Sequence, residues 1–301
     1  MTSEADRAAA ADQPKGGPGA AASTGGAWSH RPYPDARTFL GIIPTEDPLH
    51  WLLPLRKEVM TAGDFLYGGA GLAAGIAALE ATTERPLVWA TAQYFSFARM
   101  PGTLDIILDI VVTGTSTTQA RCSIAQGDDE ILSMLATLGR RPAPATGTWA
   151  EPPDVRPIAE TRPQVVPQAF GTVHEALDMR LVHGVSRRQI LRGRPSKDTG
   201  GRAAFWLRIP GGARVPDAAD LALVGDTVPA AFASATGQPI SGNSLDNTIR
   251  VGTLVWTEWV LVDVQVHALV DGYGHGIAHL WAEDGTLLGT ASQSAVVRSP
   301  S

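Results

Sequence analysis

A run of small residues from 67 to 79 is the feature that most constrains how this chain can fold. Leu72, Ile76 and Leu79 recur at helical spacing, and every residue between them is glycine or alanine. A glycine inside a helix costs up to about 1 kcal/mol, so this helix would be a poor one in isolation. The run therefore predicts a helix that another part of the backbone surrounds closely.

Four strand-like runs follow this helix and are separated only by tight turns. Glycine, proline or aspartate marks each turn, as is typical of hairpins. Strands that follow one another this closely predict an antiparallel meander rather than βαβ units. The runs lie at residues 88–97, 103–112, 117–125 and 131–138.

The same order of elements returns in the second part of the chain. Two strand-like runs precede a largely helical stretch, which Pro229 interrupts, and four more strand-like runs follow it. The turns that begin at Gln126 and Ala282 lie 156 residues apart, a separation typical of a duplicated domain rather than a solenoid. The elements of the second part lie at residues 176–182, 203–209, 217–233, 245–251, 259–269, 274–281 and 287–297.

These patterns divide the chain into four segments. We predict a disordered tail at 1–29, an N-terminal unit at 30–140, a proline-rich connector at 141–168 and a C-terminal unit at 169–301. Residues 1–26 contain no Leu, Ile, Val, Phe, Trp or Tyr, so they cannot bury much apolar surface. We expect the sheets of the two units to join edge to edge, because pairing covers their open edges.

The balance of charged residues argues against a nucleic-acid-binding protein. Twenty-four basic and 30 acidic residues give a net charge of −6, whereas nucleic-acid binders normally carry a basic patch. The longest apolar run, at 65–79, is shorter than the roughly 20 residues of a membrane span, and residues 1–26 lack the apolar core of a signal peptide. We therefore expect a soluble, cytoplasmic protein that binds neither nucleic acid nor a membrane. The sequence leaves open whether it forms a homo-oligomer.

Neither a disulfide nor a metal site is expected. Cys122 is the only cysteine, and we interpret it as a core residue. His275 and His279 are four residues apart, but in a strand this spacing separates them by about 13 Å, which is too far to bind one metal ion.

A central helix wrapped by a long antiparallel sheet is the hotdog architecture, and two such units in one chain make a double hotdog. Four stretches of this chain resemble the acyl-CoA thioesterase II family. The glycine-rich helix at 65–73 resembles the family's first helix, although the family commonly has Gln where Ala70 stands. The family's second-half motif Ser-Leu-Asp-His-Ser corresponds here to Ser-Leu-Asp-Asn-Thr. That motif lies in the stretch 244–249, and the remaining two stretches lie at 93–102 and 290–298.

The resemblance covers roughly residues 30–301 and implies the fold class α+β, a double hotdog of two tandem repeats in which an antiparallel β-sheet wraps a central helix. It also implies a hydrolase of lipid metabolism that cleaves an acyl-CoA or acyl-carrier-protein thioester into an acid and a thiol, with no cofactor or metal. In the family, an Asp, a Thr or Ser, and a Gln of the second half hold and polarise water. Matched residue by residue, these positions fall on Asp246, His267 and Gln293, so His267 departs from the family's Thr or Ser.

The chemistry of these side chains fits thioester hydrolysis. A carboxylate accepts a proton from water, so Asp246 is the predicted general base. An amide both donates and accepts hydrogen bonds, so Gln293 is predicted to orient the water, and Ala291 and Ala295 leave room on its face of the strand. His267 would donate a hydrogen bond or titrate near neutral pH. Free N–H groups at the start of a helix would hold the oxyanion.

Two other functions fit the same residues. Hotdog hydratases and dehydratases that act on acyl thioesters pair an Asp with a His, as Asp246 and His267 could. The second alternative is a non-catalytic acyl-thioester-binding protein, in which the change to His267 has ended hydrolysis. A Ser-His-Asp hydrolase is not favoured, because no Gly-x-Ser-x-Gly precedes a helix. We interpret a basic stretch as a solvated loop, with contact to coenzyme A phosphates as the alternative; it comprises Arg187, Arg188, Arg192, Arg194 and Lys197.

Overall fold

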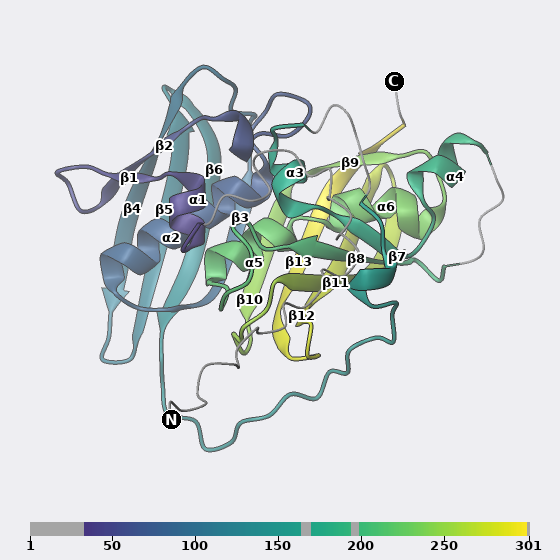
Figure 1. The fold of residues 1–301 in the computed structure, drawn as a ribbon. Helices are drawn as coiled ribbons and strands as arrows, with labels where there is room; N and C mark the ends of the chain where they lie inside the picture. Colours follow the sequence, from purple (N-terminus) through teal and green to yellow (C-terminus); the bar gives the residue numbers. More distant parts are fainter. Residues whose placement is uncertain (1–32, 164–169, 194–198, 300–301) are drawn as a thin grey trace, which may run out of the picture.

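Thirteen strands of the described residues form one continuous antiparallel sheet (Figure 1). The computed structural model describes residues 33–163, 170–193 and 199–299. Along the sheet the order is β1-β2-β4-β5-β6-β3-β10-β13-β12-β11-β8-β7, and β9 pairs with β13. The predicted tail at 1–29 lies outside the described residues, as do Arg194 and Lys197 of the basic stretch.

The elements divide between two parts of the chain. The first part contains α1 (Ala36–Leu40), β1 (Ile43–Pro44), β2 (His50–Pro54), the 3₁₀ helix η1 (Lys57–Val59), α2 (Gly68–Thr83), β3 (Leu87–Tyr94), β4 (Thr103–Thr113), β5 (Thr117–Gln126) and β6 (Asp129–Gly139). The second contains η2 (Ile158–Glu160), α3 (Val173–Leu177), β7 (Arg180–His183), α4 (Arg187–Leu191), β8 (Arg202–Arg208), α5 (Ala218–Gly225), α6 (Val228–Thr236), β9 (Ser241–Ser244), β10 (Asp246–Val251), β11 (Trp259–Val270), β12 (Tyr273–Ala282) and β13 (Leu287–Arg298). No helix of the described residues is both long and apolar enough to cross a membrane.

The two halves of the sheet repeat the same order of strands around the β3–β10 pair. The order β2-β4-β5-β6-β3 on one side matches β8-β11-β12-β13-β10 on the other. At this seam Thr91 lies directly opposite Thr248, and their hydroxyl groups form a hydrogen bond of 2.7 Å. The predicted double hotdog is confirmed, and its two sheets join edge to edge as expected.

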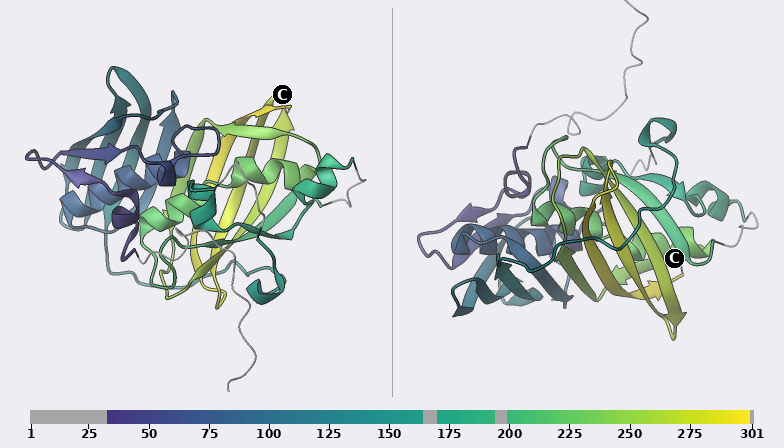
Figure 2. Two further views of the ribbon diagram at one scale, coloured as in Figure 1. Left: turned by 45° about the horizontal axis from the view of Figure 1, so that its top comes forward. Right: turned by 90° about the horizontal axis from the view of Figure 1, so that it is seen from below.

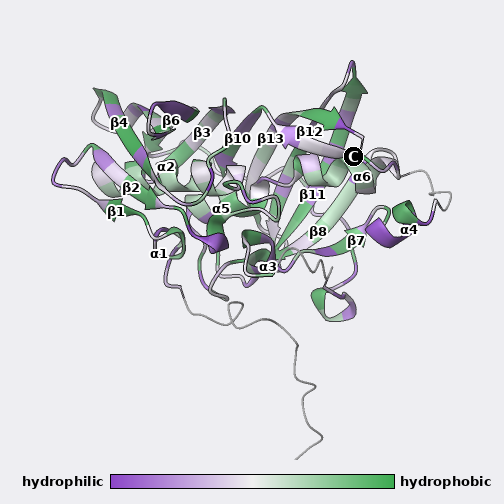
Figure 3. Ribbon diagram, turned by 90° about the horizontal axis from the view of Figure 1, so that it is seen from above, coloured by the Kyte–Doolittle hydropathy of each residue, from purple (hydrophilic) through white to green (hydrophobic). Residues whose placement is uncertain are grey.

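Helix α2 is surrounded as closely as its small residues predict. Residues 69–79 are all buried. A methyl group added to Gly75 would lie 2.8 Å from Met134 Cε on β6, and one added to Gly69 would lie 2.7 Å from the carbonyl oxygen of Ala222 in α5. Glycine therefore lets α2 approach the sheet along one side and α5 along another, an arrangement visible in Figures 2 and 3.

The second half differs from the predicted elements at four points, one of which is that Arg187 and Arg188 lie in α4 rather than in a loop. The strand predicted at 176–182 is the end of α3 followed by β7, because Asp178 takes a left-handed backbone conformation (φ 38°) and ends the helix. The predicted helical stretch is two helices separated at Asp226, and Pro229 lies in the first turn of α6, where a missing N–H costs nothing. The strand predicted at 245–251 is preceded by the separate short strand β9.

The described part of the connector packs against the face of the sheet that lies away from the helices. In β8, Phe205 belongs to the core around the helices, whereas its neighbour Trp206 faces the other way. The Trp206 indole N–H donates a hydrogen bond of 3.1 Å to the Arg156 carbonyl oxygen. The cluster on this face consists mainly of Trp206, Trp259, Leu261 and Trp281, covered by Ala150, Val155 and Ile158.

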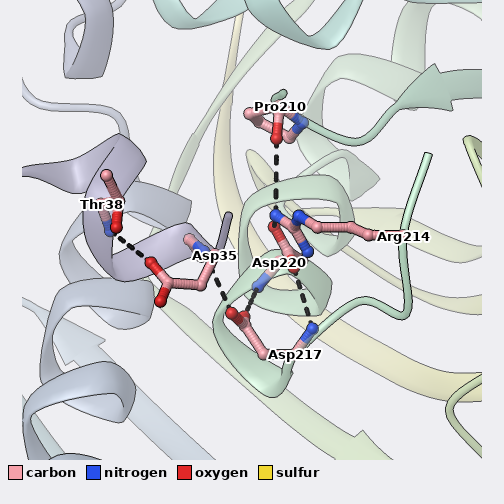
Figure 4. A network of polar contacts seen from close by, with 7 residues as sticks. Asp35, Thr38, Pro210, Arg214, Asp217 and Asp220 are labelled. Atoms are coloured by element: carbon pink, nitrogen blue, oxygen red, sulfur yellow. Dashed lines mark hydrogen bonds and ion pairs between the residues drawn. The ribbon is translucent and has the colours of Figure 1, made fainter. Parts of the chain in front are cut away.

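A polar network fastens α1 to the start of α5 (Figure 4). One carboxylate oxygen of Asp217 caps α5 by accepting the Asp220 N–H at 2.8 Å, and the other accepts the Ala36 N–H at 3.0 Å. The Arg214 guanidinium donates two hydrogen bonds to the buried Asp220 carboxylate. The network therefore ties the first described helix to the central helix of the other half.

Candidate active site

Asp226 lies at the break between α5 and α6 and is buried in the seam between the two halves. Helix α5 ends at Gly225 and α6 begins at Val228, so Asp226 belongs to neither helix. Gly225 lets the end of α5 approach the sheet closely, since a methyl group there would lie 2.8 Å from Ile249 Cδ1 on β10 and 3.1 Å from Ala291 Cβ on β13. The break thus holds a carboxylate against the sheet, inside the core.

Three donors from three different segments reach the Asp226 carboxylate. The Gly69 N–H at the start of α2 donates to Oδ2 at 2.5 Å. Gln293 Nε2 and the Ser244 hydroxyl donate to Oδ1, the latter at 3.3 Å. One donor comes from the first half and two from the second, so the first half completes the surroundings of this carboxylate.

Gln293 is buried on the inner face of β13, and its amide has a fixed orientation. Its Oε1 accepts the Val228 N–H at the start of α6 at 3.0 Å. Its Nε2 donates to Asp226 and, at 3.2 Å, to Ser244 Oγ. Because the oxygen is held by a helix N–H, the amide must turn its donors toward the carboxylate and the hydroxyl.

Burial raises the pKa of Asp226 to about 6. The hydrogen bonds from Gln293, Gly69 and Ser244 oppose this rise because they stabilise the ionised form. The carboxylate is therefore ionised at neutral pH, yet close enough to its pKa to accept a proton, which is the property of a general base.

Two tyrosines of the first half lie beside this carboxylate. The Tyr67 hydroxyl donates to the backbone carbonyl of Asp226 at 2.7 Å, and the Tyr94 hydroxyl donates to the Gly68 carbonyl at 3.0 Å. Burial raises the pKa of each tyrosine well above its ordinary value, so both remain protonated donors.

A cavity of about 390 Å³ opens beside Asp226, between the two halves. Asp226 and Ser244 lie in its wall, whereas Gln293 lies behind them. The start of α2 also borders it, through Gly68. Much of the remaining wall is apolar, with Phe65, Phe97, Ile131 and Leu132 from the first half and Met179 and Pro229 from the second.

The structure brings only one of the three sequence-predicted residues to this site. Gln293 is at its centre. The half-buried Asp246 carboxylate instead accepts the backbone N–H of Ser294 at 2.8 Å. The exposed His267 stacks on His275, with ring centroids 5.8 Å apart, whereas Gln293 is buried. The described contacts do not assemble the predicted set of three.

Asp226 and Ser244 are the residues that the sequence analysis missed. Ser244 is the first residue of the Ser-Leu-Asp motif from which Asp246 was selected. Asp226 is an acidic residue between the apolar runs 221–225 and 228–233, shortly before Pro229. An acid between two apolar helical runs is the signal that could have pointed to it. Among the described residues, no group of three or more His, Cys, Asp or Glu is arranged to hold a metal ion.

The sequence of the chain matches a known protein family. The family described as the acyl-CoA thioesterase C-terminal domain matches residues 146–297. A search of curated proteins by sequence found no match.

Solved structures share the fold over nearly their whole length. A provisionally assigned thioesterase from Novosphingobium aromaticivorans is 27% identical, with a TM-score of 0.73 over 85% of this chain and 98% of that one. A hot dog protein of unknown function from Alicyclobacillus acidocaldarius is 20% identical, with a TM-score of 0.76 over 89% and 100%. The acyl-CoA thioesterase II TesB2 of Mycobacterium marinum is 16% identical, with a TM-score of 0.68 over 88% and 98%.

Proposed function

We propose that this chain, which belongs to the acyl-CoA thioesterase family and is a thioesterase, hydrolyses acyl-CoA with Asp226 as the general base. The observation that carries the assignment is a buried carboxylate with a pKa of about 6 in the wall of an apolar cavity. Gln293 and Ser244 hold the carboxylate in place. Asp246, the base predicted from the family resemblance, lacks these contacts, and its carboxylate instead accepts a backbone N–H of β13.

The proposed reaction needs only water and the side chains of this site. Asp226 accepts a proton from water as the water oxygen attacks the thioester carbonyl carbon, and the carbonyl electrons move onto oxygen to form a tetrahedral oxyanion. Collapse of this intermediate breaks the C–S bond. The proton on Asp226 then passes to the thiolate sulfur, so the products are an acid and a thiol and the carboxylate is regenerated.

The start of α2 is the proposed oxyanion site. The N–H of Gly69 already donates to Asp226, and those of Ala70 and Gly71 donate to the Tyr67 carbonyl, so the proposed donor at the cavity wall is the N–H of Gly68, the first residue of the helix. Such donors stabilise charge that develops on a carbonyl oxygen, and the helix dipole adds to their effect. The acyl group would then lie along the apolar part of the cavity.

The alternative of a hydratase or dehydratase gains no support from the site. That chemistry requires an Asp and a His on one substrate, and the predicted pair of Asp246 and His267 bonds to Ser294 and stacks on His275 instead. We also propose that the acyl carrier is coenzyme A rather than an acyl-carrier protein, because the matching family is described as an acyl-CoA thioesterase.

Release of free thiol from a panel of acyl-CoA thioesters tests the function. Asp226→Asn keeps the size of the side chain and removes its charge, so we expect kcat/KM to fall at least about 100-fold. The matched control is Asp246→Asn, which should retain most of the activity. Circular dichroism and Tm establish that both variants are folded. Full activity in a folded Asp226→Asn variant, or a large loss in Asp246→Asn alone, would overturn the assignment of the base.

A further inference from the structure

The first half reaches the Asp226 carboxylate through the peptide group between Gly68 and Gly69. The carbonyl oxygen of Gly68 and the N–H of Gly69 belong to the same planar unit. The oxygen accepts the Tyr94 hydroxyl at 3.0 Å, and the N–H donates to Asp226 Oδ2 at 2.5 Å. Tyr94 and the carboxylate are therefore linked through the two ends of one peptide.

A hydrogen bond to a carbonyl oxygen draws electron density from the peptide and makes its N–H a stronger donor, because bonds in a chain polarise one another. It also fixes the rotation of the peptide plane, and thus the direction of the N–H. The hydroxyl of Tyr94 therefore affects both the strength and the aim of the donor that holds Asp226.

The surrounding residues leave little freedom for this link to change. A methyl group on Gly68 would lie 2.9 Å from Asp226 Oδ2 and 3.2 Å from Tyr94 Cζ, so the tyrosine ring and the carboxylate both crowd the same α-carbon. The backbone of Tyr94 is held at the seam, where its N–H donates to the Leu245 carbonyl at 2.9 Å. Tyr94 also lines the cavity, although its hydroxyl is engaged with the backbone.

We propose that Tyr94 is a positioning residue of the first half, which acts through the Gly68–Gly69 peptide to hold the Asp226 carboxylate in its reactive orientation. This inference rests on the proposed function of Asp226 as the base. If so, the first half contributes directly to the site, since the Gly69 N–H that donates to Asp226 and the tyrosine that orients it both belong to the first half.

The test is Tyr94→Phe, which removes one oxygen atom and keeps the ring. Loss of one neutral hydrogen bond should lower kcat about 3- to 10-fold and leave KM nearly unchanged. A weaker donor stabilises the carboxylate less, so the acid inflection of the kcat/KM profile should move upward by about half to one pH unit. A purely structural role would lower Tm without moving this inflection.

Two further variants separate failure of this inference from failure of the proposed function. Tyr273→Phe removes a hydroxyl from an exposed tyrosine and should leave the rate and the inflection as they are. In the Asp226→Asn background, Tyr94→Phe should have no further effect on the residual rate. If Asp226→Asn abolishes activity but Tyr94→Phe moves neither kcat nor the inflection, the positioning role is wrong and the base assignment stands. If Tyr94→Phe does not fold, the same role is tested by 3-fluorotyrosine at position 94, which keeps the ring and the hydroxyl, makes the hydroxyl a stronger donor and should lower the inflection; an unchanged inflection would overturn the role.

Discussion

Asp226 combines burial with three hydrogen bonds, and its titration should govern the rate. Since the base must be ionised and its pKa is raised to about 6, kcat/KM should be constant above about pH 7 and should fall about tenfold for each unit below pH 6. The measurement is initial thiol release at saturating and limiting acyl-CoA from about pH 4.5 to 8.5. The Asp246→Asn variant is the control and should keep the same inflection. A profile that is flat between pH 5 and 7 would exclude Asp226 as the base.

At this scale the sequence predicts Gln293 but not its partners. Ala291 and Ala295 lie two residues before and after Gln293, so the three share one face of the strand, and this pattern predicts that the face is packed. The Asp246 carboxylate on β10 accepts the N–H of Ser294, the residue after Gln293 on β13, and successive residues of a strand point to opposite faces. Asp226 joins Gln293 only through the packing of α6 under β13, a contact across 67 residues that no local pattern contains.

At the scale of elements, the glycines of α2 are not equivalent, and their replacement should show it. Alanine favours a helix over glycine by up to about 1 kcal/mol. At Gly75 the added methyl meets the flexible end of Met134, so the gain and the cost nearly cancel. At Gly69 it meets the backbone oxygen of Ala222 in α5, which cannot move alone. We expect Gly75→Ala to change the free energy of unfolding by less than about 1 kcal/mol and Gly69→Ala to lower it by about 1–3 kcal/mol.

Thermal and urea unfolding of the two alanine variants provide the comparison, with Gly147→Ala in the exposed connector as a control. Equal stability of the Gly69→Ala and Gly75→Ala proteins would contradict the close packing of α2 on α5. The sequence predicts that α2 is tightly surrounded, because its small residues allow no other role. It does not predict which neighbour touches which glycine, since the partners come from β6 and from the other half of the chain.

At the scale of the whole molecule, duplication gives two similar halves, but within the described residues the carboxylate–amide pair belongs to the second half alone. Thr91 and Thr248 face each other across the seam, and they pair with Leu135 and Ser292 on their outer neighbours. The residue that follows Leu135 is Ala136, which therefore occupies in the first half the position of Gln293 in the second. The order of strands and turns predicts this duplication. Which half carries the carboxylate–amide pair depends on single side chains, so the order of strands and turns does not predict it.

The acyl group is proposed to lie along the cavity between the halves. The size of this cavity should therefore set the length of acyl chain that the protein accepts. Met179 enters the wall from the second half, and Met179→Trp would fill part of the roughly 390 Å³. We expect kcat/KM for long acyl chains to fall at least about tenfold, since overfilling a packed space costs about 1–3 kcal/mol. For acetyl-CoA the value should change little, because a short acyl group stays beside Asp226.

The ratio of kcat/KM between a long and a short acyl-CoA is the quantity to measure, since it cancels any general loss of folded protein. Leu135→Trp is the matched control, because it adds similar bulk to an exposed position of β6 outside the cavity wall. Its ratio should equal that of the unmodified protein. If Met179→Trp lowers the rates for all chain lengths by the same factor, the acyl group does not lie along this cavity, and the thioester must reach Asp226 from another side.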